Sequence, residues 1–401
     1  MIPEIPEIQS ALQRANLDGW LFYSFRGSDP IAAQILGSKG GGHLATRRWL
    51  YLIPRSGEPV KINHAIESGA LEHLPGKQLI YLPWQQLHRF IRESLSALSP
   101  GRAPRVAMQY SPNGSIPYLA RVDAGTIELI RSFGVEIVSS AELVQRFESV
   151  WSDAQIAMHT EAARLLYAIV NDAFAEIARR IRAREPATEL GIQGFIAGRF
   201  RENGLVSSDL PIVAVNANSA SPHYEPTPER HSPIREGDFV MIDLWAKQNK
   251  PAAVYADITW VGVIGAQVPA EIAKVFAVVR DARDAAAKFT IDAFRAGRTI
   301  TGASVDDACR AVIRDAGYGA FSLHRTGHNI HTEVHGNGAN IDNLETEDTR
   351  VLLPRTCFSI EPGVYLAGKF GVRSEVDMLL LEHDARVTGG EPQKEVLRIL
   401  S

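Results

Sequence analysis

Residues 238–244 have the sequence DFVMIDL, and residues 254–261 have the sequence VYADITWV. Each run has the apolar, β-branched and aromatic composition of a strand, and a polar segment at 247–251 separates them, so the two predict an antiparallel hairpin. Each arm carries one acid among apolar neighbours, Asp243 on the first and Asp257 on the second. A carboxylate in such surroundings needs a cation or several hydrogen-bond donors. One such acid would favour a salt bridge or a helix cap, but two facing each other favour a metal site.

A second pair of acid-bearing strands is predicted at residues 357–361 and 371–381, which carry Glu361 and Glu375. These two glutamates are spaced as the two aspartates are, which hints at a duplicated half, although no internal repeat is strong enough to identify. Glu361 ends its strand just before a turn. Glu375, taken alone, fits an exposed strand residue as well as it fits a metal ligand.

Histidines gather between the two hairpins, where four of the 12 in the chain fall between positions 324 and 335. A single histidine usually makes an ordinary polar contact, but four so close together indicate a site. A His-x-x-x-His zinc helix is the local alternative, but the glutamate that it requires is not in place. Four carboxylates and one imidazole suit a pair of divalent ions, which makes a hydrolase the first hypothesis. The five candidate metal ligands are Asp243, Asp257, His328, Glu361 and Glu375.

The overall composition is that of an ordinary globular protein, with 401 residues, 45% hydrophobic residues and a net charge of −4. The length predicts two domains. The slightly acidic balance argues against binding to nucleic acid or to an anionic membrane surface, and no apolar run of about 18 residues predicts a membrane span. Only two cysteines and no secretory pattern at the start fit a reducing compartment, so we expect a cytoplasmic enzyme.

The chain is expected to divide near Val150. In the first 150 residues, strand-like runs at 20–23, 49–53, 78–82 and 105–108 occur with an amphipathic segment at 84–98, which indicates an α/β domain. Ser152 to Gln155 fit a capping box that opens a new helix. The prediction is an α+β protein with domains at 1–150 and 151–401. Further helices are predicted at 188–203, 269–296 and 304–316.

Several motifs resemble those of the pita-bread metallopeptidases, and the match is closest to the proline-specific branch of prolidase and aminopeptidase P. The resemblance implies a pita-bread catalytic domain from about residue 151, preceded by a smaller α/β creatinase-like domain. The motifs are the paired aspartates, residues 218–224 ending in His223-Tyr224, Gly327-His328 followed by His335, Ser359-Ile360-Glu361-Pro362-Gly363, and Gly371-Val372-Arg373-Ser374-Glu375.

The resemblance also implies a role for each candidate ligand in a dinuclear site. Asp243 would chelate one ion, and Asp257 and Glu375 would bridge both. His328 and Glu361 would bind the second ion. Glu361 would also help to deprotonate a bridging water molecule.

Four further residues would handle the substrate if the resemblance holds. His223 and His335 would contact the substrate carbonyl and the oxyanion that develops from it. His324 would form part of the pocket wall. Arg373 would receive a substrate carboxylate through forked hydrogen bonds.

The chain departs from the family pattern at three places. His331 stands where the family has a glycine, Gly336 stands where it has an acid, and the spacing from Asp243 to Asp257 is longer than usual. The longer hairpin still lets both arms present their acids. We interpret His331 as a loop residue.

The function implied is that of an Xaa-Pro dipeptidase, which would use a metal-bridging hydroxide on proline-containing dipeptides or short peptides. Aminopeptidase P, acting on longer peptides, is the close alternative. A methionine aminopeptidase would lack the N-terminal half, and a creatinase-like amidinohydrolase or a non-catalytic binding module would have lost the ligands.

The implied cofactor is two divalent ions per subunit. A carboxylate-rich site suits Mn²⁺, although Zn²⁺ or Co²⁺ remain open. A homodimer is expected, in which an N-terminal loop of the partner closes the site.

Overall fold

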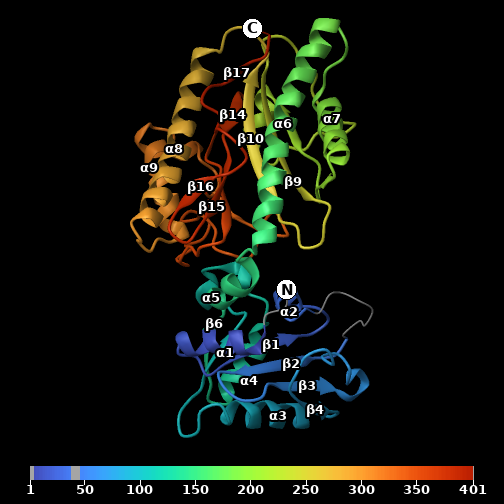
Figure 1. The fold of residues 1–401 in the computed structure, drawn as a ribbon, viewed down its shortest axis with the longest axis vertical. Coiled ribbons are helices and arrows are strands. Elements are labelled where there is room, and N and C mark those ends of the chain that lie inside the picture. Colours follow the sequence, from blue (N-terminus) through green and yellow to red (C-terminus); the bar gives the residue numbers. More distant parts are fainter. Residues whose placement is uncertain (1–3, 38–45, 401) are drawn as a thin grey trace. The chain divides into compact units, whose positions relative to one another are not determined.

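The computed structural model describes residues 4–37 and 46–400. The chain divides into two compact units, one ending at Glu148 and the other beginning at Ser149 (Figure 1). Each unit has its own buried apolar core, so each is described separately.

The N-terminal unit is built on one mixed sheet with strand order β4-β3-β2-β1-β5-β6. β1 pairs antiparallel with β2 and parallel with β5. The predicted strands and the helix are confirmed, and α3 turns Leu87, Ile91 and Leu95 inward at helical spacing. The strands are β1 Gly19–Ser24, β2 Trp49–Pro54, β3 Val60–His64, β4 Lys77–Tyr81, β5 Arg105–Met108 and β6 Glu136–Ser139; the helices are α1 Ile5–Arg14, α2 Pro30–Ile35, α3 Trp84–Ser96, α4 Ala124–Ser132 and α5 Ala141–Val144.

The first half of the C-terminal unit packs two helices against the predicted hairpin. The long helix α6 begins after Ser152. The Ser152 side chain accepts the N–H of Gln155, and the Gln155 side chain accepts the N–H of Ser152, so the predicted capping box is confirmed. α6 lies against β9 and β10 and contributes Phe174 and Ile177 to their core. The elements are α6 Asp153–Ala183, α7 Glu189–Glu202, β7 Leu205–Val206, β8 Ile212–Val215, β9 Phe239–Gln248 and β10 Ala256–Val263.

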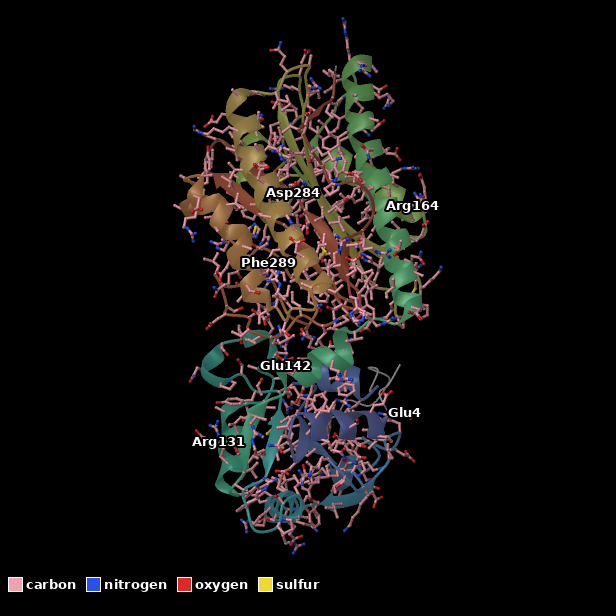
Figure 2. The ribbon with its side chains drawn as sticks, turned by 60° about the vertical axis from the view of Figure 1, so that its left-hand side comes forward. Glu4, Arg131, Glu142, Arg164, Asp284 and Phe289 are labelled. Atoms are coloured by element: carbon pink, nitrogen blue, oxygen red, sulfur yellow. The ribbon has the colours of Figure 1, made fainter. Side chains whose placement is uncertain are left out.

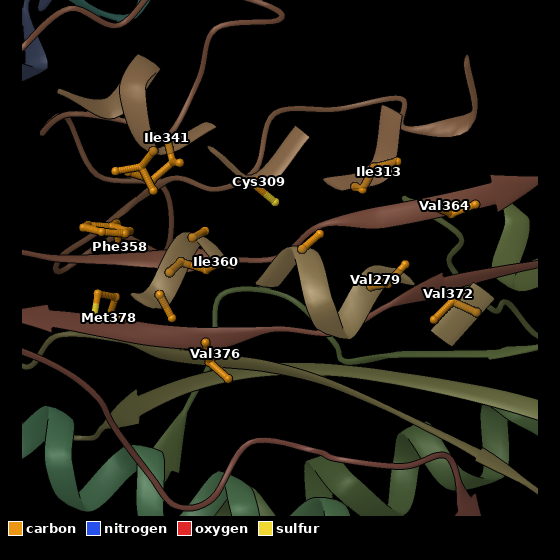
Figure 3. Packing of buried hydrophobic residues seen from close by; sticks show 14 of the residues in the cluster. Val279, Cys309, Ile313, Ile341, Phe358, Ile360, Val364, Val372, Val376 and Met378 are labelled. Atoms are coloured by element: carbon orange, nitrogen blue, oxygen red, sulfur yellow. The ribbon is translucent and has the colours of Figure 1, made fainter. Parts of the chain in front are cut away.

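The second half repeats this arrangement of two helices against strands. Val279 of α8 and Ile313 of α9 pack with Phe358, Ile360 and Met378 in one continuous core (Figure 3). Its sheet has the order β11-β12-β15-β16, β13 pairs with β14, and β17 joins the edge of β10. The elements are α8 Ala270–Arg295, α9 Gly302–Asp315, β11 Asn329–Ile330, β12 Cys357–Ile360, β13 Gly363–Leu366, β14 Phe370–Arg373, β15 Val376–Leu380, β16 Ala385–Val387 and β17 Leu397–Arg398.

The outer faces of the long helices carry charged side chains. Arg164 on α6 pairs with Glu161, and Asp284 on α8 pairs with Arg283 (Figure 2). This division of apolar and charged faces is the amphipathic pattern of helices that cover a sheet. Within the described residues, no helix is long and apolar enough to cross a membrane.

Two predicted boundaries were wrong, and the second difference shapes the site. β9 runs through Lys247 to Gln248, where a turn was expected, because β7 pairs with this end of the strand and the Lys247 ammonium lies 4.6 Å from the Tyr255 ring centre. Residues 371–381 are not one strand. β14 ends at Arg373, and the backbone of Ser374 and Glu375 bonds to Pro362 and Thr259 before β15 begins.

Candidate metal centre

The register of β9 and β10 decides where the two aspartates project. Asp243 lies opposite Thr259, and Trp245 lies opposite Asp257. Directly opposite residues in an antiparallel pair project from the same face of the sheet, and so do residues two apart on one strand. Asp243 and Asp257 therefore share one face as diagonal neighbours, with Thr259 and Trp245 beside them.

Glu361 and Glu375 arrive from the other half of the unit. β12 and β15 pair up to Ile360 and Val376, so the two glutamates flank the end of this ladder. The backbone N–H of Glu375 donates to the Thr259 carbonyl at 3.3 Å, and the Thr259 hydroxyl donates to Glu375 Oε2 at 2.7 Å. Thr259 thus joins the two halves at the acids.

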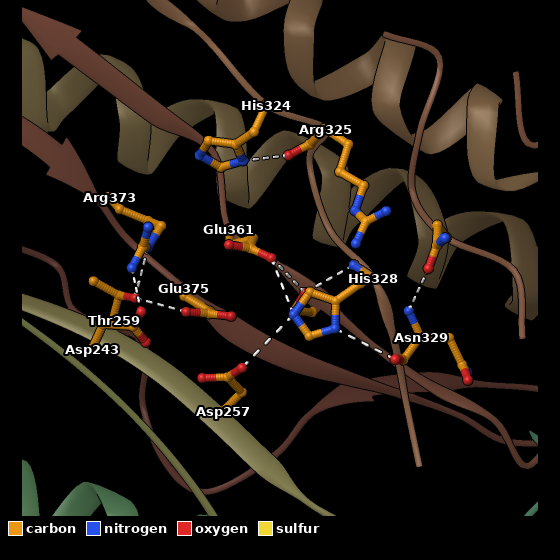
Figure 4. A network of polar contacts seen from close by, with 12 residues as sticks. Asp243, Asp257, Thr259, His324, Arg325, His328, Asn329, Glu361, Arg373 and Glu375 are labelled. Atoms are coloured by element: carbon orange, nitrogen blue, oxygen red, sulfur yellow. Dashed lines mark hydrogen bonds and ion pairs between the residues drawn. The ribbon is translucent and has the colours of Figure 1, made fainter. Parts of the chain in front are cut away.

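His328 is placed by its neighbour Gly327. A Cβ on Gly327 would stand 1.8 Å from the Ser359 carbonyl oxygen, so only glycine allows this close approach. The His328 N–H then donates to Ser359 Oγ at 3.0 Å. Its ring Nε2 lies 3.2 Å from Glu361 Oε1 and 3.7 Å from Asp257 Oδ2 (Figure 4).

The structure brings three predicted ligands into one buried cluster. One ligand atom from each of Asp257, His328 and Glu375 lies within 4.8 Å of the others. Asp257 Oδ1 and Glu375 Oε1 are buried and make no hydrogen bond. Because a buried carboxylate oxygen without a partner is costly, a divalent cation would relieve both groups at once. The donor set therefore fits a metal ion.

The pKa shifts of the residues in and around the cluster also favour a metal site. Burial, and then the neighbouring carboxylates, raise the pKa of Asp257 and of Glu375 well above the ordinary range. Burial also raises the pKa of Asp243, against the nearby Arg373 guanidinium. Burial lowers the pKa of His328 to about 3, so its ring is neutral at pH 7 and has a lone pair for a metal ion.

Asp243 stands outside the cluster of three and pairs with Arg373. The buried Arg373 also donates from Nε to Thr259 Oγ1 at 3.0 Å, and from Nη1 to the Pro222 carbonyl at 3.3 Å and the Tyr365 hydroxyl at 3.4 Å. The guanidinium lies inside the site, and a substrate carboxylate would have to displace one of these partners. Its expected role in receiving that carboxylate stays a prediction.

The three other predicted histidines are less buried than His328. His335 is exposed, its ring centre is 4.2 Å from that of His328, and this neighbour above all lowers the pKa of His335 to about 3. His324 Nε2 lies 2.8 Å from the Tyr365 hydroxyl, which links it to Arg373. His223 is exposed as well, and a positive charge on its ring would lower the pKa of Asp243 and of His335.

The sequence interpretation missed Thr259 and Tyr365. Thr259 carries a usable signal, since it follows Asp257 by two positions in a strand and so shares its face. Tyr365 belongs to the β13–β14 hairpin, which was not predicted. His331 was interpreted as a loop residue; it directly follows β11, and its backbone carbonyl accepts the Tyr255 N–H at 2.9 Å.

Comparison with known families agrees with this geometry. A model of metallopeptidase family M24 matches residues 159–382, which include all five predicted ligands. The chain belongs to metallopeptidase family M24.

Several similar proteins carry Xaa-Pro or prolidase names. An Xaa-Pro dipeptidase of Lactobacillus delbrueckii subsp. lactis is 34% identical over 170 residues, which cover 41% of this chain and 40% of that protein. The prolidase from Thermococcus sibiricus matches with a TM-score of 0.64 at 22% identity, over 98% of both chains. The X-Pro aminopeptidase from Thermotoga maritima matches with a TM-score of 0.57 at 23% identity, over 96% of this chain and 99% of that one.

The similarity to solved structures shows the fold and not the substrate. The matches to the solved structures cover nearly the whole chain, and they confirm the predicted pita-bread domain with a smaller domain before it. The chain spans about half the length of the first curated relatives that it matches.

Proposed function

We propose that this protein is a dinuclear metal-dependent hydrolase that cleaves the Xaa-Pro bond of dipeptides, an Xaa-Pro dipeptidase. One observation carries the proposal: the buried cluster of Asp257, His328 and Glu375, in which two carboxylate oxygens have no hydrogen-bond partner. Membership of family M24, and relatives named Xaa-Pro dipeptidase and prolidase, support the reaction and the substrate class.

In this proposal two divalent ions bind between the halves of the C-terminal unit. Asp243, Asp257, His328, Glu361 and Glu375 would hold them. The ions would polarise the peptide carbonyl and lower the pKa of a water molecule. We propose Mn²⁺ because carboxylates dominate the ligand set, with Zn²⁺ or Co²⁺ as alternatives. Elemental analysis of the purified protein tests this choice.

Glu361 is suited to move the proton. Its side chain is 15% exposed, whereas that of Asp257 is 6% exposed and that of Asp243 is 10% exposed. Glu361 is therefore the most accessible of these three acids. From there it can accept a proton from the attacking water and deliver it to the leaving proline nitrogen.

The histidines are suited to hold the substrate carbonyl. With a pKa of about 3, His335 is neutral at pH 7 and offers one ring N–H as a hydrogen-bond donor. We assign His335 and His223, which are both exposed, to the carbonyl oxygen and to the negative charge that develops on it. His324, fixed by Tyr365, would form the adjoining wall.

We propose two roles for Arg373, and its contacts in the structure rank them. Its pairing with Asp243 makes it an orienting group for a metal ligand. Receiving the free carboxylate of a dipeptide is its second proposed role, and that role requires one guanidinium nitrogen to exchange the Pro222 carbonyl or the Tyr365 hydroxyl for the substrate.

The bond before proline sets a particular problem for a peptidase. It is a tertiary amide without an N–H, so an enzyme cannot recognise it through a donated backbone hydrogen bond. The proposed machinery acts on the carbonyl and on the leaving nitrogen, and it needs no amide hydrogen. This chemistry suits a dipeptidase and an aminopeptidase equally, and relatives of both names are known.

Two peptides separate these functions. Protein loaded with Mn²⁺ is given Ala-Pro or Ala-Pro-Ala, and release of the first residue is measured for each, with Glu375→Gln as the inactive control. A dipeptidase predicts faster cleavage of Ala-Pro. Preference for Ala-Pro-Ala would assign the aminopeptidase P function, and failure on both would overturn the proposal.

We further propose a homodimer in the cytoplasm, because resemblance to the proline-specific branch implies a dimer and the two cysteines fit a reducing compartment. Light scattering tests the assembly, since a monomer mass would exclude it. Fractionation of cells that produce the protein tests the compartment.

A further inference from the structure

A second polar cluster lies directly behind Asp257, and the proposed chemistry does not use it. It consists of His159 on α6, Asp377 on β15 and Thr388 just after β16, and all three residues are buried. None was predicted to belong to the site. Buried polar side chains are usually retained for the groups that they contact, so their partners decide what they do.

Asp377 contacts the backbone of a proposed metal ligand. Its Oδ2 accepts the N–H of Asp257 at 2.9 Å, in a buried hydrogen bond that joins β10 to β15. Burial raises the pKa of Asp377 well above the ordinary range, so the carboxyl acts here through its hydrogen bond and not through its charge. The bond therefore restrains the main chain at the residue whose side chain faces the metal site.

His159 restrains the same segment two residues earlier. Its Nδ1 lies 2.7 Å from the Tyr255 carbonyl oxygen, which only accepts, so Nδ1 carries the proton. Nε2 then accepts the Thr388 hydroxyl at 2.8 Å. Burial lowers the pKa of His159 to about 4, which keeps the ring neutral with this single N–H.

The position of Asp257 explains why such restraint matters. β10 begins at Ala256, so Asp257 is only the second residue of its strand. Strand ends open most easily. His159 from α6 and Asp377 from β15 hold the backbone on both sides of Ala256, and the His331 carbonyl accepts the Tyr255 N–H as well.

We propose that Asp377 and His159 are positioning residues that clamp the start of β10 and so hold Asp257 in place for metal binding. This inference rests on the proposed metal site. Partners that hydrogen-bond the side chains of metal ligands typically change metal affinity about 10–100-fold when they are removed, and we expect this backbone clamp to act within that range.

The same strand offers a matched control. Farther along β10, the Val261 N–H donates to Gln393 Oε1 at 3.0 Å, and Gln393 is buried. This is also a bond from the backbone of β10 to a buried side-chain oxygen, but Val261 is not a proposed ligand. Gln393 Nε2 also donates to the Val261 and Glu395 carbonyls at 2.6 and 2.9 Å, so Gln393→Leu removes more hydrogen bonds than Asp377→Leu does and is a strict control for general loss of stability.

The experiment measures Co²⁺ binding to the full chain after chelation and removal of its metal. Calorimetry gives the affinity, the visible absorption of bound Co²⁺ reports the ligand geometry, and thermal melting of the metal-free protein reports stability. The variants are Asp377→Leu, which removes the acceptor, Asp377→Asn, which keeps an acceptor oxygen, and Gln393→Leu.

We expect Asp377→Leu to weaken Co²⁺ binding about 10–100-fold and to alter the absorption spectrum. Asp377→Asn should stay within about 5-fold of the native affinity because its amide oxygen can still accept the Asp257 N–H. Gln393→Leu should lower the melting temperature while leaving affinity and spectrum unchanged. If Asp377→Leu does not fold, His159→Leu takes its place, with a loss of at least about 3-fold expected.

Three results would overturn the inference. The first is native affinity and spectrum in Asp377→Leu, or in His159→Leu where that variant replaces it. The second is an equal loss of Co²⁺ affinity in Asp377→Asn and Asp377→Leu, which would mean that metal binding depends on the charge of Asp377 and not on its hydrogen bond. The third is an equal loss of Co²⁺ affinity in Gln393→Leu, which would mean that Asp377→Leu acts only by lowering the general stability of the fold. A native chain that binds no Co²⁺ would instead overturn the proposed metal site, and the inference with it.

Discussion

At the scale of single residues, the site is a set of acids that are costly to bury without a cation. Asp257 and Glu375 each keep a buried oxygen without a partner, and burial together with the neighbouring carboxylates raises the pKa of each. His328, in contrast, is held neutral. A cluster of this kind is unfavourable when empty and favourable with divalent ions, which is the energetic signature of a binding site.

The first prediction concerns pH and metal affinity. Because the pKa values of Asp257 and Glu375 are raised well above the ordinary range, the metal-free site holds protons that a metal ion must displace. Mn²⁺ affinity should therefore rise with pH until both carboxyls are ionised, and binding should release protons. Calorimetry in buffers of different ionisation enthalpy measures that release. An affinity that does not change between pH 5.5 and 8, with no proton release, would contradict the prediction.

Tertiary context limits what could be predicted about residues. Asp243, Asp257 and His328 stand out in the sequence because acids within strands and clustered histidines are locally unusual. Tyr365 and Asp377 are locally ordinary, and their importance comes from contacts with His324 and Asp257, which are distant in the chain. Only the folded structure brings such partners together.

At the scale of elements, two structural halves meet at the acids. One half presents Asp243 and Asp257 from β9 and β10, and the other presents Glu361 and Glu375 from the ends of β12 and β15. Gly327 determines how closely the His328 segment approaches β12.

The second prediction therefore concerns Gly327. In Gly327→Ala the new methyl group would meet the Ser359 carbonyl oxygen at 1.8 Å, so the segment carrying His328 must move. The free energy of unfolding should fall by about 2 kcal/mol, as in other overpacked cores, and Mn²⁺ affinity should fall with it. Denaturant unfolding and calorimetry measure the two effects.

Gly194 in α7 is the matched control, because a Cβ there would meet nothing within 4 Å. Gly194→Ala should raise stability by up to about 1 kcal/mol through helix propensity and leave affinity unchanged. Equal effects at the two glycines would contradict the role assigned to Gly327.

The elements also show where prediction from sequence succeeds. The helix at Ser152 and the β9–β10 hairpin carry strong local signals, a capping box and alternating apolar runs, and both were predicted correctly. The break between β14 and β15 has no local signal. It depends on backbone bonds from Ser374 to Pro362 and from Glu375 to Thr259.

At the scale of the whole molecule, metal binding and folding are coupled. Any ligand that binds only the native state stabilises it, by about 2.7 kcal/mol when the free ligand is at 100 times its dissociation constant. The third prediction is that chelation lowers the melting temperature and that Mn²⁺ restores it in a concentration-dependent way. Calorimetric melting with a range of Mn²⁺ concentrations measures the effect. Mg²⁺ at the same concentrations is the control for ionic strength, and melting that does not respond to Mn²⁺ would contradict the account.

Cleavage of Ala-Pro by the metal-free chain during titration with Mn²⁺ tests the central claim most directly. The account predicts no proline release without metal, activity that grows until two ions are bound per chain, and no activity in Glu375→Gln at any Mn²⁺ concentration. Equal rates with and without metal, or a fully loaded native chain that releases no proline, would contradict it.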